Sequence, residues 1–228
     1  MTNSEQQLYN SCKEDPLSIF TLIKQGHYEI VGELLLNGDV NVNTVDGVGN
    51  DVVVRLLKAG QYDLVLQLMK KRNWDVNHQN DEGNTFGHIL AYDNSVAAVK
   101  VVEQLTKKKN YIPNIKNKKG ETALDRAINN NYLCTAFKIL EDKRFNDINI
   151  SSFKNLYNAT IKSALYGKYS KITNLEIIVG NLEKKELAPT MQELVDNITD
   201  NMEAIKWGIM NNNSSILDSI IDRHTLTD

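Results

Sequence analysis

The stretch "SIFTLIKQGHYEIVGELLLNGDVNVN" at residues 18–43 aligns without a gap with "VVVRLLKAGQYDLVLQLMKKRNWDVN" at residues 52–77, at a spacing of 34 residues. The two copies share Leu22/Leu56, Gly26/Gly60, Tyr28/Tyr62, Val31/Val65 and Leu34/Leu68. In each copy a glycine separates two apolar segments of helical periodicity. Glycine accepts the left-handed backbone conformation that a tight turn requires. Each copy therefore predicts a helix, a turn and a second helix.

Polar connectors follow the two copies at residues 44–50 and 78–84, where aspartate and glycine favour turns. The pattern continues beyond them. Residues 85–94 predict a first helix that ends at Asn94, a residue type that tolerates a positive φ. The following helix is expected to place Val96, Val99 and Val102 where Tyr62, Val65 and Leu68 lie in the second copy.

A repeat of 33 to 37 residues with this composition indicates a solenoid of stacked helix pairs. We expect an all-α fold of about five to six helix-turn-helix repeats that diverge towards the C-terminus. The predicted segments are an N-terminal capping helix in 1–16, repeats at 17–49, 50–83, 84–120 and 121–150, and divergent repeats or capping helices in 151–228. Fifth and sixth helix pairs are expected around residues 161–175 and 205–221.

Two loop-and-helix segments resemble the ankyrin-repeat family. They are "NDEGNTFGHILAYDN" at 80–94 and "NKKGETALDRAINNN" at 117–131. Thr85, His88 and Ala91 match the threonine, histidine and alanine of the ankyrin motif, although Phe86-Gly87 replaces its Pro-Leu pair. The resemblance implies stacked repeats with a concave binding face, and it gives His88 a structural role in bonding across the repeat loop. Tetratricopeptide repeats share the 34-residue period, but their bulky aromatic pattern in the first helix is missing here.

Composition narrows the class of protein further. The chain has 228 residues, of which 41% are hydrophobic and 24% charged, and its formal charge is −3. A charge so near zero gives no general attraction to nucleic acid or membranes. No apolar run reaches the about 18 to 20 residues that span a bilayer, and the N-terminus does not look like a signal peptide. With two cysteines, the chain is expected in the cytoplasm or nucleus, without a disulfide framework.

The sequence predicts no catalytic, cofactor-binding or metal-binding residues. The four histidines lack cysteine or carboxylate neighbours at metal-ligand spacing. "DGVGND" at 46–51 lacks the pattern of a phosphate-binding loop. Cys134 is expected to be a buried, inert thiol in a second helix, and Trp74 is expected to pack between repeats. The location of Trp207, in the core or on the surface, stays open.

Charge is unevenly distributed along the chain. Seven lysines and one acid, Glu103, occur in 100–119, whereas acids dominate from 186 onwards. The lysines are either a solvated face or a surface for an acidic partner segment. Nucleic-acid binding is a weaker alternative, since that stretch has no arginine and one aromatic residue, Tyr111.

We therefore expect a non-catalytic protein-interaction module, monomeric or part of a hetero-complex, that binds a partner on its loops and first helices. The expected contact residues are Asp46, Asn50, Arg55, Asp81, Glu82, Asn84, Tyr92, Lys118, Lys119, Glu121 and Asn129. Alternatively, residues 151–228 form a separate regulatory or enzymatic domain that the repeats target.

Overall fold

The computed structural model describes two main stretches, residues 2–145 and 189–211. It also describes shorter pieces at 151–153, 155–156, 159–160, 176, 179–180, 182–183, 213, 215–216 and 219. The chain divides into two compact units, Met1–Ala123 (unit 1) and Leu124–Asp228 (unit 2). The predicted fifth helix pair lies outside the described residues, as does most of the second half of the sixth.

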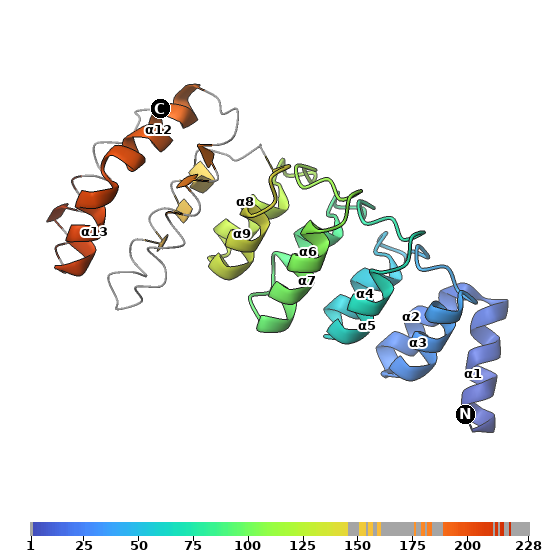
Figure 1. Ribbon diagram of the computed structural model, residues 1–228. Coiled ribbons are helices and arrows are strands. Elements are labelled where there is room, and N and C mark those ends of the chain that lie inside the picture. Colours follow the sequence, from blue (N-terminus) through green and yellow to red (C-terminus); the bar gives the residue numbers. More distant parts are fainter. Residues whose placement is uncertain are drawn as a thin grey trace. The chain divides into compact units, whose positions relative to one another are not determined.

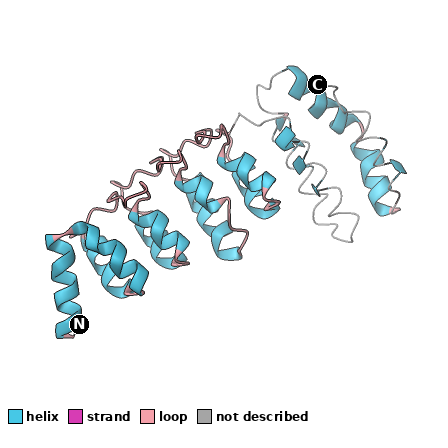
Figure 2. Ribbon diagram, turned by 180° about the vertical axis from the view of Figure 1, so that it is seen from behind, coloured by secondary structure: helices cyan, strands magenta, loops and turns pink. Residues whose placement is uncertain are grey.

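Unit 1 is a stack of helix pairs, as the repeats predict. Its elements are α1 (Asn3–Glu14), the 3-10 helix η1 (Pro16–Ser18), α2 (Ile19–Gln25), α3 (Tyr28–Asn37), α4 (Val52–Lys58), α5 (Tyr62–Leu68), α6 (Phe86–Leu90) and α7 (Val96–Thr106). The pairs α2/α3, α4/α5 and α6/α7 lie side by side in chain order (Figure 1). The loops between pairs run along one edge of the unit (Figure 2). The expected all-α stack of helix pairs is confirmed for unit 1.

The N-terminal helix α1 packs against α3. A capping box starts α1, because the Thr2 hydroxyl accepts the Glu5 N–H while the Glu5 carboxylate accepts the Thr2 N–H at 2.6 Å. Tyr9 and Cys12 form its buried face, and the Tyr9 hydroxyl donates to the carboxylate of Asp39 at the end of α3. Helix α1 thus packs on the first helix pair through α3.

The turns inside the helix pairs have the predicted conformation. Gly26 and Gly60 have φ values of 85° and 74°. At the second turn the N–H groups of Gly60 and Gln61 donate to the carbonyls of Leu57 and Leu56 at 2.9 and 3.0 Å. These bonds satisfy carbonyls that the end of α4 leaves without helical partners.

The second helices supply much of the core. Val65, Leu68 and Met69 of the α5 region are buried, and Ala98, Val101, Val102 and Leu105 are their counterparts in α7. The spacing between these faces is 33 residues, so the expected register of α7 is wrong by one residue. Val96, which the sequence aligned with Tyr62, is 76% exposed.

The third helix pair also differs from prediction at its turn. Helix α6 ends at Leu90, before the predicted end at Asn94, and Asn94 has no positive φ. The cause is the start of α7. The Asp93 carboxylate accepts the Ser95 N–H at 2.8 Å, and the Ser95 hydroxyl caps α7 by accepting the Ala98 N–H at 3.1 Å. These local bonds favour an earlier exit from the first helix.

Unit 2 contains α8 (Ala123–Asn129), which begins at the unit boundary, α9 (Leu133–Leu140), α12 (Pro189–Asp200) and α13 (Met202–Met210). Asn131, between α8 and α9, has a φ of 57° in the predicted turn. The prediction of a buried Cys134 is wrong. Its side chain is exposed, because the core face of α9 is formed by Leu133, Ala136, Ile139 and Leu140. Trp207 on α13 is 52% exposed.

Candidate protein-binding groove

Equivalent turns shape the three loops of unit 1. Asp46, Asn80 and Asn117 stand at spacings of 34 and 37 residues. In each loop, one side-chain oxygen accepts the N–H groups two and four residues further on, at 2.9 to 3.0 Å. Asx turns of this kind hold a tight loop without regular secondary structure. The sequence analysis did not identify Asn80 and Asn117 as loop-forming residues, although both follow Asp46 at the repeat spacing.

A ladder of hydrogen bonds joins one loop to the next. The amide of Asn80 donates to Asn50 Oδ1 at 2.9 Å, and the amide of Asn117 donates to Asn84 Oδ1 at 3.0 Å. Backbone bonds run alongside, from Asp81 N–H to the Val48 carbonyl at 3.3 Å and from Lys118 N–H to the Glu82 carbonyl at 3.0 Å. Asn50 and Asn84, expected as partner contacts, are 3% and 4% exposed and have a structural role in this ladder.

His88 fixes the third loop, as predicted. Its Nδ1 accepts the Thr85 N–H at 3.1 Å, and its Nε2 lies 2.8 Å from the Glu121 carbonyl. This pattern fits a neutral ring with its proton on Nε2. The side chain is 1% exposed, so it bridges neighbouring loops in the core of unit 1.

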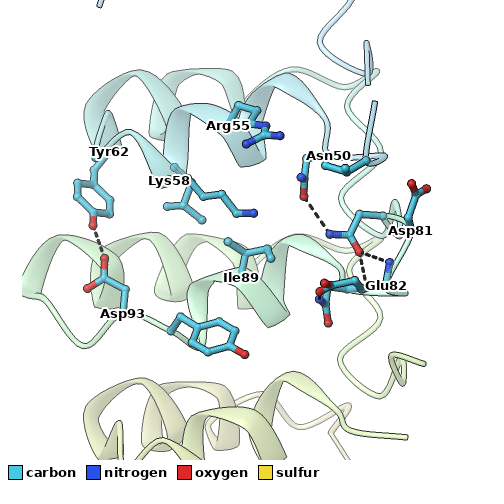
Figure 3. A pocket seen from close by; sticks show the side chains of 14 residues that line it. Asn50, Arg55, Lys58, Tyr62, Asp81, Glu82, Ile89 and Asp93 are labelled. Carbon is cyan, nitrogen blue, oxygen red and sulfur yellow. Dashed lines mark hydrogen bonds between the residues drawn. The ribbon is translucent and has the colours of Figure 1, made fainter. Parts of the chain in front are cut away.

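A groove of about 630 Å³ lies over α4, α6 and the loops that precede them (Figure 3). Six of the expected contact residues line it: Asn50, Arg55, Asp81, Glu82, Asn84 and Tyr92. It combines exposed apolar surface with charge. Val48 is 50% exposed and Tyr92 is 53% exposed, while Ile89 lies between the two helical walls in Figure 3.

The α4 wall of the groove is cationic. Arg55 forms an ion pair through Nε with Asp46, whose carboxylate also accepts two backbone N–H groups. Burial acts to raise the pKa of Asp46, but these bonds outweigh it and hold the pKa below its usual value. The pair fixes the guanidinium and leaves its two terminal nitrogens without hydrogen bonds to the described residues. Lys58, also on α4, is exposed.

The loop wall of the groove is acidic. Asp81 and Glu82 are both exposed at the tip of the second loop. One oxygen of Glu82 accepts the Asn84 amide at 2.7 Å. Asp81 is held through its backbone N–H, and its exposed carboxylate has one oxygen beside Gly49 of the preceding loop.

The far end of the groove is closed by a bond between repeats. The hydroxyl of Tyr62 donates to the carboxylate of Asp93 (Figure 3). Burial alone would raise the pKa of Asp93, but the bonds from Tyr62 and Ser95 lower it below the usual value. The sequence aligned Tyr28 with Tyr62 but gave no sign of the Asp93 contact, because the partner lies in the next repeat.

Replacing Tyr62 with phenylalanine is expected to lower the free energy of unfolding by about 1–2 kcal/mol at pH 7, because a partly buried carboxylate loses a hydroxyl donor. The folded-state pKa of Asp93 lies below its unfolded value, so this contribution is complete above about pH 4 and is lost as the pH falls through the folded pKa. Urea unfolding at pH 7 and pH 3 should show a smaller difference between wild type and variant at pH 3. An equal difference at both pH values would contradict the assignment.

Of the five remaining expected contact residues, Asp46 holds Arg55 and the other four lie outside the groove. Lys118, Lys119 and Glu121 belong to the third loop of unit 1, where both lysines are exposed and Glu121 accepts the Asn117 amide at 3.2 Å. Asn129 is the exposed last residue of α8, in unit 2.

Part of the lysine-rich stretch borders a second depression, of about 700 Å³, over α5 and α7. Lys107 pairs with Glu103 at 2.6 Å. Lys108 donates to the Met69 carbonyl at 2.6 Å and lies 5.6 Å from the centre of the Trp74 ring, and burial lowers its pKa. These two lysines are therefore engaged within unit 1.

The described residues hold no cluster of three or more His, Cys, Asp or Glu side chains that could bind a metal ion. Among the same residues, no helix combines the length and apolarity needed to cross a bilayer.

Comparison with known families agrees with the repeat geometry. The family model described as ankyrin repeats (3 copies) matches residues 52–152. Residues 52–152 thus carry ankyrin repeats, which are generally protein–protein interaction modules and typically non-catalytic. A search of curated proteins found no match.

Proposed function

We propose that the chain is a non-catalytic adaptor that binds a partner protein in the groove over α4 and α6, within a larger complex in the cytoplasm or nucleus. One observation carries this proposal: exposed aromatic, aliphatic and charged side chains meet over a rigid floor. The asparagine ladder and the His88 bonds fix that floor before any partner arrives. A preformed surface binds at a lower entropic cost than one that must order on binding.

Tyr92 is the expected anchor of the interface. It is 53% exposed at the end of α6, and tyrosine is enriched among residues that dominate interface energies. Lys118, Lys119 and Glu121 would extend the contact onto the third loop, and an acidic partner segment would suit the two lysines. Asn129, the exposed last residue of α8 in unit 2, stays a separate proposed contact residue.

Replacing Tyr92 with alanine is expected to weaken partner binding at least about tenfold. The test is quantitative affinity purification of the full chain from its native cell, comparing wild type with Tyr92→Ala and Arg55→Ala. Val96→Ala is the matched control, because Val96 is exposed but does not line the groove. Partners retained by the control and lost from the Tyr92 variant support the proposal. If every co-purifying protein is bound equally by all variants, the groove is not the binding face.

A further inference from the structure

The groove carries two opposite charges that pair with none of the described residues. Among the described residues, Lys58 on α4 and Asp81 on the second loop form no ion pair or side-chain hydrogen bond, and both are exposed. They belong to opposite walls of one groove, with Ile89 between them (Figure 3). Each charge is reinforced by a neighbour, Arg55 beside Lys58 and Glu82 beside Asp81.

Unpaired charges are tolerated in the free protein because water solvates them. A partner that covers the groove removes that water, and an unmatched charge then opposes binding. Arg55 adds geometric selectivity. Its Nε is held by Asp46, and the two terminal nitrogens remain to receive a planar carboxylate.

We infer that the groove binds a polarised protein segment, with an acidic side chain against Arg55 and Lys58 and a basic side chain against Asp81 and Glu82. An apolar side chain between them rests on Ile89 and Tyr92. The two charged walls thereby fix the direction in which the partner chain crosses the groove. This inference rests on the proposed function and adds the chemistry of the partner.

The test uses a displayed library of random 12-residue peptides selected on the full-length wild-type protein, followed by affinity measurements with synthetic copies of the enriched peptides. These peptides should carry one acidic and one basic residue on either side of an apolar residue. Lys58→Glu and Asp81→Lys should each weaken their binding about tenfold, because attraction becomes repulsion. Neither side chain has a bonding partner within the described residues, so both variants should fold as wild type does.

A charge-swap experiment provides the decisive test of the inference. A peptide whose acidic residue is changed to lysine should bind Lys58→Glu better than it binds wild type. Lys70→Glu is the control, because it makes the same charge change at an exposed position that does not line the groove. It should leave every affinity within about twofold.

Two results overturn the inference in distinguishable ways. If peptides lose affinity with Tyr92→Ala but are unaffected by Lys58→Glu and Asp81→Lys, the groove binds peptides without the charge polarity. If no enriched peptide responds to Tyr92→Ala, the groove is not the binding face and the proposed function fails as well.

Discussion

Trp74→Ala is expected to lower the free energy of unfolding by about 3–5 kcal/mol, the cost typical of removing a fully buried aromatic side chain. Trp74 is 1% exposed, and its ring meets the edge of Phe86 with the centroids 5.0 Å apart and the planes at 86°. The variant would leave a cavity where the second repeat packs on the third.

The same substitution also weakens the start of α4. The indole Nε1–H of Trp74 donates to Asp51 Oδ2 at 3.1 Å, while Asp51 Oδ1 caps α4 by accepting the Val54 N–H at 2.7 Å. Burial raises the pKa of Asp51. Losing the indole donor would leave this buried side chain with one hydrogen bond fewer, which destabilises the folded state.

Urea unfolding at pH 7 measures the effect of Trp74→Ala. Trp74→Phe should fall between alanine and wild type, because it retains most of the volume and loses the N–H donor. Val96→Ala should change the stability by no more than about 0.5 kcal/mol, because the side chain is 76% exposed. A loss below about 1 kcal/mol for Trp74→Ala would show that the packing between these repeats is not as described.

Gly83→Ala is expected to cost about 2–4 kcal/mol, the second-largest effect. Gly83 has a φ of 75°, and a Cβ atom there would lie 2.8 Å from the Lys118 backbone nitrogen and 3.2 Å from Asn117 backbone atoms. The alanine therefore adds left-handed strain and forces two loops apart. The separation would also strain the bond from Lys118 N–H to the Glu82 carbonyl.

Gly120→Ala is the matched control for this prediction. Gly120 has a φ of 77°, but a Cβ atom there would meet nothing within 4 Å. It should cost only the conformational strain, about 1–2 kcal/mol. The difference between the two variants in urea unfolding reports the clash alone, and equal losses would argue against the close approach of the two loops.

The sequence predicted the parts of the fold that local chemistry determines. The turns at Gly26 and Gly60 and the polar loops follow from residue types at fixed spacing, whereas the role of His88 was implied by the resemblance to the ankyrin motif. The register of α7 and the end of α6 could not be predicted in this way. Helix α7 starts at Val96, 34 residues after Tyr62 as the repeat implies, but its buried face is shifted by one residue, and the local bonds of Asp93 and Ser95 end α6 early. The predicted burial of Cys134 was wrong because its apolar neighbours in sequence, such as Leu133 and Ala136, lie on a different face of α9.

The candidate site was only partly visible in the sequence. Loop and first-helix positions were identified as a group, and the structure brings six of them to one groove. From the sequence, Asn50, Asn84 and Asp81 looked like equivalent contact residues. In the structure, Asn50 and Asn84 are buried in the hydrogen-bond ladder, whereas the carboxylate of Asp81 stays exposed. That distinction depends on which side chains meet across repeats, and alignment at a fixed period does not report it.

The most direct test of the account is hydrogen exchange of the full chain with and without a saturating peptide selected from the displayed library. We predict that the peptide slows exchange in residues 46–58 and 80–93, which form the floor and walls of the groove. Slowed exchange confined to α3, α5 and α7, with the groove unchanged, would contradict a binding face over α4 and α6.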